Sequence, residues 1–292
     1  MRATFIDCLI QFNNKGGNAF LLVGDLGYSV IEEFCNKYPR NFINVGVAEQ
    51  NMAGIAAGIA SEGYQVFCYS IGNFNTFRCA EQIRNDIDYH SLPVCTVSVG
   101  GGVAYGNMGY SHHAIQDMAL MRVFANTTIY APVDANETRN CFEAIVKDKS
   151  PAYLRLHKSG ERQITSSKEA ILAGVPIYRS GCSTSKRVLL TSGFCGQGAF
   201  AYVQKNSDWC HYTLPAWGLR HKTYMPVFAS RFDEIVIIED HLLDAGFCSW
   251  VLESLIGTKH IQKVKSRSLL AESVGCVGSE EYLHQKSGLY SL

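Results

Sequence analysis

Residues 44–54 read Asn-Val-Gly-Val-Ala-Glu-Gln-Asn-Met-Ala-Gly and join a β-branched run to a helix of small apolar residues. The helical pattern continues to Ala60. A helix surface made of small apolar residues lets another backbone approach closely, and we expect it to be buried. Its one acid, Glu49, stands at the start of the pattern. Burial disfavours the ionised form of a carboxylic acid, and an acid that stays protonated can donate a hydrogen bond to a nitrogen base. Simple capping of the helix is the structural alternative.

Strand-like apolar runs alternate with helical periodicity around this segment. The predicted strands are Ala19–Val23, Val66–Tyr69, Val94–Val99, Thr128–Ala131 and Ala152–Leu156. The predicted helices are Ile31–Lys37, Asn51–Ser61, Ala80–Asp88, Ile115–Arg122 and Ala135–Lys147. This rhythm predicts an α/β fold, a parallel sheet covered by helices on both faces, with ligands at the carboxyl ends of the strands.

A second α/β unit follows a segment rich in Ser, Gly and Lys. Val188–Thr191 and Glu234–Glu239 are predicted strands, and a glycine-rich turn follows the first of them. That turn lacks the Gly-x-Gly-x-x-Gly spacing of a dinucleotide site. The sequence therefore predicts two consecutive doubly wound domains, residues 1–160 and 187–292, joined by a linker over residues 161–186.

Composition excludes several classes of function. Basic and acidic residues balance at 26 each, which gives no reason to expect nucleic-acid or membrane-surface partners. No apolar run reaches the roughly 18 residues of a membrane span. The eleven cysteines include no Cys-x-x-Cys pair, and the first residues lack the features of a signal peptide. Buried reduced thiols in a cytoplasmic protein are the expectation.

The segment Gly46-Val-Ala-Glu-Gln-Asn-Met52 resembles the signature of the pyrimidine-binding domain in the transketolase family. The resemblance implies use of thiamine diphosphate, with Glu49 contacting N1′ of the aminopyrimidine and promoting the tautomer that removes the proton from thiazolium C2. The cofactor would then act as the electron sink. On this reading Glu49 is catalytic as well as cofactor-binding.

Two further segments extend the resemblance. Gly24-Asp-Leu-Gly-Tyr-Ser29 is similar to the family's turn near the thiazolium, which implies cofactor contacts from Asp25 and Leu26. The segment Tyr69–Arg84 resembles the one whose aromatic ring stacks on the aminopyrimidine. Phe74 is the first candidate for that ring and Phe77 the second, with Arg78 beside them as a further cofactor contact. Two Phe residues three apart are also typical of a core.

The resemblance also places substrate contacts. In Gly106–Asp117, Ser111 and His112 align with a Thr-His pair that faces the substrate, His112 being the catalytic one, and His113 takes the next position. No further residue at ligand spacing supports a metal site there. Arg155 corresponds to an arginine at the end of a strand that binds a substrate phosphate in members of the family. Met108 replaces an aspartate that binds a hydroxyl of the sugar donor in typical transketolases, so donor preference is expected to differ.

The chain contains no Gly-Asp-Gly motif, which in the family helps to bind the metal on the cofactor's diphosphate. The resemblance therefore implies the C-terminal half of a split transketolase, with an N-terminal diphosphate-binding subunit that holds Mg²⁺ or Ca²⁺. Two copies of each would form an α2β2 heterotetramer that transfers a two-carbon ketol or decarboxylated 2-oxo-acid unit to an aldehyde. The alternatives are the β-subunit of a 2-oxo-acid dehydrogenase and a non-catalytic scaffold.

Overall fold

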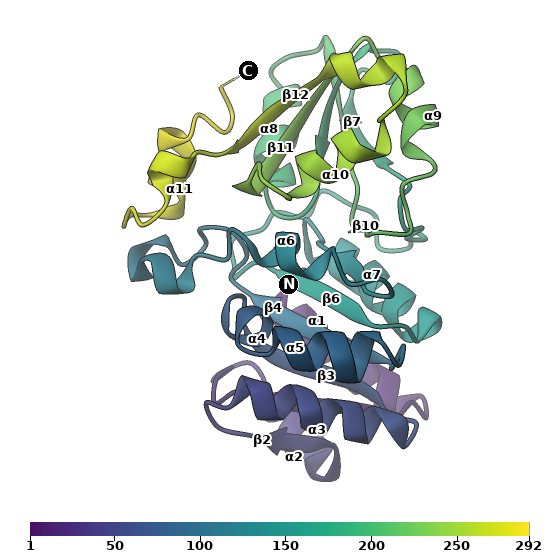
Figure 1. The fold of residues 1–292 in the computed structure, drawn as a ribbon, viewed down its shortest axis with the longest axis vertical. Helices are drawn as coiled ribbons and strands as arrows, with labels where there is room; N and C mark the ends of the chain where they lie inside the picture. The colour runs from purple at the N-terminus through teal and green to yellow at the C-terminus, as the bar shows by residue number, and fades with distance from the viewer. Residues whose placement is uncertain (292) are drawn as a thin grey trace.

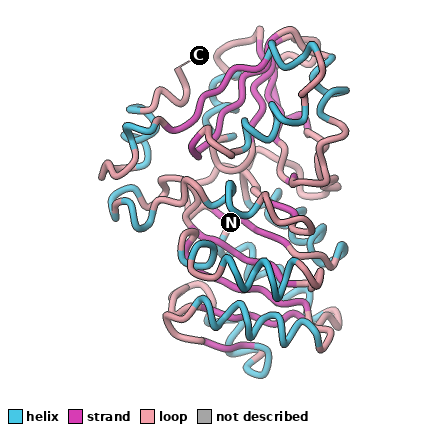
Figure 2. The backbone as a smooth tube through the Cα atoms, in the orientation of Figure 1, coloured by secondary structure: helices cyan, strands magenta, loops and turns pink. Residues whose placement is uncertain are grey.

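The computed structural model describes residues 1–291 and contains two sheets, each flanked by helices (Figure 1). The first sheet has seven strands in the order β10-β5-β6-β4-β3-β1-β2, and the second has five in the order β12-β11-β8-β9-β7. Figure 2 shows the two groups of strands as separate layers along the long axis of the molecule. The predicted α/β class with two doubly wound domains is confirmed.

The strands are short and mostly buried. They are β1 (Ala19–Val23), β2 (Phe42–Asn44), β3 (Gln65–Ile71), β4 (Val94–Val99), β5 (Thr128–Tyr130), β6 (Ala152–Leu156), β7 (Ile177–Gly181), β8 (Arg187–Thr191), β9 (Trp209–Thr213), β10 (Ala216–Trp217), β11 (Glu234–Leu242) and β12 (Val264–Leu269).

The α-helices are α1 (Arg2–Asn14), α2 (Glu32–Lys37), α3 (Glu49–Ser61), α4 (Phe74–Phe77), α5 (Ala80–Gln82), α6 (Asp117–Met121), α7 (Ala135–Asp148), α8 (Gly196–Val203), α9 (Met225–Ser230), α10 (Phe247–Ser254) and α11 (Glu280–Lys286). Short 3-10 turns cover Pro39–Asn41, Gly106–Met108, Tyr110–His112, Lys259–Lys263 and Ala271–Ser273, and a π-helical turn covers Ile83–Asp88.

The order of strands in the first sheet creates a switch point. β1 pairs in parallel with both β2 and β3. The chain adds β2 on one side of β1 and then crosses to add β3 on the other side, which is the switch point. Alternate residues of these strands enter opposite apolar clusters: Leu22 and Val66 join one, and Leu21 and Phe67 join the other. Both faces of the sheet are therefore buried, and the crevice at the carboxyl ends of β1 and β3 is where ligands bind in such sheets.

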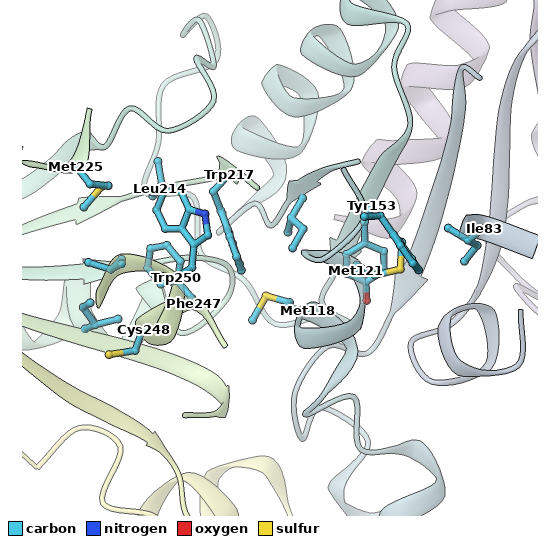
Figure 3. Packing of buried hydrophobic residues seen from close by; sticks show 14 of the residues in the cluster. Ile83, Met118, Met121, Tyr153, Leu214, Trp217, Met225, Phe247, Cys248 and Trp250 are labelled. Carbon is cyan, nitrogen blue, oxygen red and sulfur yellow. The ribbon is translucent and has the colours of Figure 1, made fainter. Parts of the chain in front are cut away.

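One apolar cluster continues from the first domain into the second. Figure 3 shows Met118 of α6 between Trp217 and Phe247 on one side and Met121 with Tyr153 on the other. The short strand β10, from the second half of the chain, also pairs antiparallel with β5 of the first sheet. The two domains are thus held together by shared core and by backbone pairing.

The structure differs from the sequence predictions at several boundaries. Helix α3 begins at Glu49 rather than Asn51, which makes the acid the first residue of the helix. The predicted linker contains β7, which pairs antiparallel with β9, so that segment is partly sheet. Helix α1 was not predicted, and the predicted helix over residues 80–88 divides into α5 and a π-helical turn. Within residues 1–291, no helix is long and apolar enough to cross a membrane.

Candidate active site

Glu49 lies at the crevice between β1 and β3 with its side chain inside the protein. Glu49 is 2% exposed and stands at the first position of α3. The Ser70 hydroxyl, at the end of β3, donates to Glu49 Oε1 over 3.0 Å. A Cβ atom added at Gly24, which follows β1, would lie 3.1 Å from Oε1. Glycine at that position therefore leaves free space beside the carboxylate, where a larger residue would crowd it.

Arg78 is the other partner of this carboxylate. Its Nη1 donates to Glu49 Oε2 over 2.8 Å, and the Arg78 side chain is 44% exposed while that of Glu49 is 1% exposed. The guanidinium carbon lies 4.1 Å from the centre of the Phe74 ring. The flat guanidinium of Arg78 thus stacks on the Phe74 ring and at the same time donates a hydrogen bond to the buried Glu49 carboxylate. These are the two contacts that an aminopyrimidine ring requires, so the residues present fit that group.

The two phenylalanine candidates have different environments. Phe74 is half-buried and its ring centre lies 5.3 Å from that of His112. Phe77 is 49% exposed. The structure therefore brings Phe74, and not Phe77, into a described contact with both Arg78 and His112.

His112 and His113 point into different surroundings. The His112 Nδ1 lies 2.9 Å from the Ser111 hydroxyl, and its ring lies 6.3 Å from that of Tyr105. Partial burial, followed by the charges of His113 and Arg78, lowers the pKa of His112, which favours a neutral imidazole. His113 is fully buried and its Nε2 lies 3.3 Å from the Gly106 carbonyl. His113 thus packs against the loop at Gly106, and its contact with a substrate stays a prediction.

Asp25 and Leu26 form the turn after β1. Asp25 adopts a left-handed φ of 56° and is exposed, and its Oδ1 accepts from Tyr28 Oη and Asn44 Nδ2, each over 3.1 Å. Its backbone N–H donates to Asn44 Oδ1 over 3.2 Å. Leu26 is half-buried and packs against an apolar cluster behind the sheet. The turn therefore borders the crevice, and Asp25 is the member whose polar atoms face outward.

The predicted substrate role of Arg155 is not supported by its position. Arg155 is 6% exposed, and its Nε donates to Asp117 Oδ2 over 2.8 Å. Its Nη2 donates to the carbonyl oxygens of Ala114 and Asp240, over 2.8 and 3.0 Å. The bond to Asp240 joins the two domains, because Asp240 lies in β11 of the second sheet. A guanidinium used in this way has few donors left for a substrate phosphate.

Several residues of the site were not identified from the sequence. Ser70 orients Glu49, and Asn73 Nδ2 donates to the His113 carbonyl over 2.8 Å. Tyr105 lies between the His112 ring and Lys158, whose Nζ is 5.9 Å from the Tyr105 ring centre. Ser70 and Asn73 could have been found from their place at the end of a predicted strand. No sequence signal distinguishes Tyr105 from an ordinary half-buried tyrosine.

Comparison with known proteins connects this geometry with one family. Residues 1–162 match the family described as "Transketolase, pyrimidine binding domain". The chain is 33% identical over 159 residues to a subunit of apulose-4-phosphate transketolase from Phocaeicola vulgatus, covering 54% of this chain and 51% of the relative. It is 30% identical over 214 residues to 6-deoxy-6-sulfo-D-fructose transketolase subunit SqwH of a Clostridium species (strain MSTE9), covering 70% of this chain and 66% of the relative.

The chain spans about half to two thirds of the length of these curated relatives. Among solved structures, it is similar to one described as "Split gene transketolase, inactive beta4 tetramer". That likeness has a TM-score of 0.81 and 26% sequence identity, and it covers 99% of this chain and 93% of the other. A structure-wide match of this extent includes both domains.

Proposed function

The chain belongs to the transketolase family, and from that premise we propose that it is the C-terminal subunit of a split, thiamine-diphosphate-dependent transketolase. The observation that carries the proposal is the position of the Arg78 guanidinium, stacked on Phe74 and bonded to Glu49. An aminopyrimidine ring would use the same ring face and the same carboxylate. The transketolase family uses thiamine diphosphate, which when bound supplies the electron sink for making and breaking a carbon–carbon bond beside a carbonyl group.

The residues of this chain have separate roles in that proposal. Glu49 exchanges a proton with the pyrimidine nitrogen, and Ser70 holds its carboxylate in place through the bond to Oε1. Phe74 provides the stacking surface, and the buried position of Glu49 excludes water from the exchanged proton. Arg78 contacts both groups in this structure and would have to move for the ring to stack on that face of Phe74. Asp25 and Leu26 lie at the turn beside Gly24 and are proposed to contact the thiazolium side.

A partner subunit is proposed for the diphosphate end of the cofactor. The chain contains no Gly-Asp-Gly motif, so Mg²⁺ or Ca²⁺ is proposed to be held mainly by an N-terminal diphosphate-binding subunit. The outward face of α3 carries Gly54 and Gly58, where an added Cβ would meet nothing within 4 Å. That open face supports self-association and an α2β2 heterotetramer. The inactive tetramer named for the similar split transketolase is consistent with a requirement for a second subunit.

The substrate is proposed to lie along the row His112, Tyr105 and Lys158. His112 is proposed as the catalytic residue that binds and orients the reacting oxygen, with Ser111 bonded to its ring. Lys158 is half-buried and replaces Arg155 as the cation offered to an anionic group. Met108 is 56% exposed and supplies no acceptor for a donor hydroxyl. We therefore propose transfer of a two-carbon ketol or decarboxylated 2-oxo-acid unit to an aldehyde.

The alternatives are less well supported. The relatives described above are transketolase subunits, which favours a transketolase over the β-subunit of a 2-oxo-acid dehydrogenase. A scaffold without activity has no use for a buried glutamate whose carboxylate is bonded to an arginine. All eleven cysteines are free, which supports a reducing compartment and hence the cytoplasm.

Isothermal titration of thiamine diphosphate with magnesium tests the proposal directly. The titration is made into this chain alone, into a candidate N-terminal subunit alone, and into the two together. We expect saturable binding in the mixture, and no comparable binding to either chain alone, because the two ends of the cofactor would lie on different chains. No binding in the mixture, with a partner that forms a complex with this chain, would contradict the assignment.

A further inference from the structure

Two histidines and two acids from three distant segments of the chain meet at α11. Figure 1 shows this helix at the edge of the second domain. His157 follows β6, Asp240 lies in β11, and Glu280 and His284 occupy α11. The spacing of Glu280 and His284 places both side chains on one face of that helix. His157, Asp240 and His284 are 4%, 3% and 7% exposed, so three of the four are more than nine-tenths buried.

Three of the four side chains bring a ligand atom close enough to share one ion. One oxygen of Asp240, one oxygen of Glu280 and one ring nitrogen of His284 all lie within 4.8 Å of one another. Asp240 Oδ1 and His284 Nε2 are 3.1 Å apart. Ligands about 2.0–2.2 Å from a tetrahedral zinc ion are separated from each other by about 3.3–3.6 Å. The observed separation therefore needs only a small adjustment.

Two buried atoms of the cluster contact each other and have no other polar partner among the described residues. They are Asp240 Oδ1 and His284 Nε2, which lie 3.1 Å apart. His157 is oriented from behind, because its Nδ1 lies 2.8 Å from the Ser159 carbonyl. Its Nε2 is then directed at Glu280, 2.8 and 3.0 Å from the two carboxylate oxygens. His157 thus orients the Glu280 carboxylate, as hydrogen-bonded partners orient metal ligands in other proteins.

We propose that Asp240, Glu280 and His284 bind a divalent transition-metal ion of the zinc class, with His157 orienting the Glu280 carboxylate. An imidazole ligand beside two carboxylates favours zinc or cobalt over magnesium or calcium, which prefer oxygen ligands alone. The charge balances, since one divalent cation offsets two carboxylates. The nearby Arg155 is already paired with Asp117.

A route for the ion also exists. A cavity of about 520 Å³ is lined by Glu280 and His284 together with Phe194, Gln197 and Tyr290. The sequence did not reveal this site because its ligands come from positions 240 and 280–284, with no local spacing motif.

The bound ion would fasten α11 to the rest of the protein. The segment just before α11 contacts the loop that carries His112, since Gly278 N–H donates to the Gly106 carbonyl over 3.3 Å. Metal binding would therefore hold that loop as well as the helix. The role is structural, and it does not depend on thiamine diphosphate or on a partner subunit.

The test uses the full chain, freed of metal with a chelator and then titrated with Co²⁺ alone. We expect one-to-one binding with the strong visible absorption of tetrahedral cobalt, which Zn²⁺ displaces. His284→Ala and Glu280→Gln should each weaken binding by about tenfold or more, since removing a ligand costs at least as much as the 10–100-fold lost with its supporting partners. Zn²⁺ should raise the midpoint of thermal unfolding of the wild type and not of His284→Ala.

His90→Ala is the matched control, because His90 is exposed and outside the cluster. It should bind Co²⁺ like the wild type. Glu280→Gln keeps the proposal testable if His284→Ala fails to fold, since Glu280 is the least buried of the four. Absence of tetrahedral absorption in the wild type, or binding unchanged in both ligand variants, would overturn the proposal. The cluster would then be two His–carboxylate ion pairs.

Discussion

The Arg78 guanidinium bridges Glu49 and Phe74: its Nη1 lies 2.8 Å from Glu49 Oε2, and its central carbon lies 4.1 Å from the Phe74 ring centre. A pyrimidine ring cannot stack on that face of Phe74 and reach Glu49 until the guanidinium has moved. In the proposed function, the arginine and the aminopyrimidine therefore compete for these two contacts. A half-exposed ion pair and a half-exposed cation–π contact each contribute about 1 kcal/mol or less, so the competition is modest.

Replacing Arg78 with alanine should strengthen binding of the aminopyrimidine by about two- to tenfold, which corresponds to roughly 0.4–1.4 kcal/mol. The measurement is titration of thiamine diphosphate with magnesium into the two-subunit complex, comparing Arg78→Ala with the wild type. Arg84→Ala, on the following π-helical turn, is a matched control and should leave the affinity unchanged. Weaker binding by Arg78→Ala would instead identify the arginine as a direct ligand of the cofactor.

Glu49→Gln should bind the cofactor but fail to activate it. Glutamine keeps the size of the side chain and its bond to Ser70, and it cannot exchange a proton with the pyrimidine nitrogen. We expect exchange of the thiazolium C2 proton for deuterium, followed by NMR in the complex, to slow by about 10²- to 10⁴-fold. Glu62→Gln, at the other end of α3, changes a matched but exposed acid and should have no effect. Exchange at the wild-type rate in Glu49→Gln would remove Glu49 from the mechanism.

Comparing the cofactor affinities of Phe74→Ala and Phe77→Ala separates loss of a ring that stacks on the aminopyrimidine from loss of an ordinary packing contact. Phe74 contacts the Arg78 guanidinium and the His112 ring, whereas Phe77 is 49% exposed. Loss of the stacking ring should weaken cofactor binding by about five- to tenfold, since such a contact contributes roughly 1 kcal/mol beyond buried area. Phe77→Ala should change affinity by less than about twofold, as a surface substitution does. The reverse order in a titration of the two variants would move the stacking role to Phe77.

The sequence predicted the fold of the first domain well because its strands are continuous apolar runs with helical periodicity between them. Local motifs placed Glu49 and Phe74 among the candidate residues, and the structure brings both into contact with Arg78. The sequence did not predict the burial of His113 and Arg155, since burial depends on contacts between segments: Arg155 bonds to a backbone carbonyl 85 positions away. The ion pair of Glu49 with Arg78 was also missed, because a helix start and a segment 29 positions later meet only after the sheet forms.

A buried histidine in the second domain should make the protein sensitive to acid. His211, in β9, is fully buried, its Nε2 lies 2.9 Å from the Thr191 hydroxyl, and its Nδ1 has no partner among the described residues. Burial, assisted by the charge of Arg179, lowers the pKa of His211 to about 3. In the unfolded chain the pKa of a histidine is near 6.5.

Below about pH 6.5 the unfolded chain therefore takes up a proton that the folded protein does not, and stability is lost as the pH falls toward 3. The loss from this one group is about 1.4 kcal/mol per pH unit, or roughly 2 kcal/mol between about pH 6.5 and 5. Urea unfolding at about pH 7 and pH 5 should show that His211→Gln, which keeps a hydrogen-bonding side chain but cannot be protonated, loses less stability than the wild type by this amount. His90→Ala should lose as much as the wild type, because His90 is exposed. Equal losses in His211→Gln and the wild type would mean that His211 gains its proton in the folded protein too.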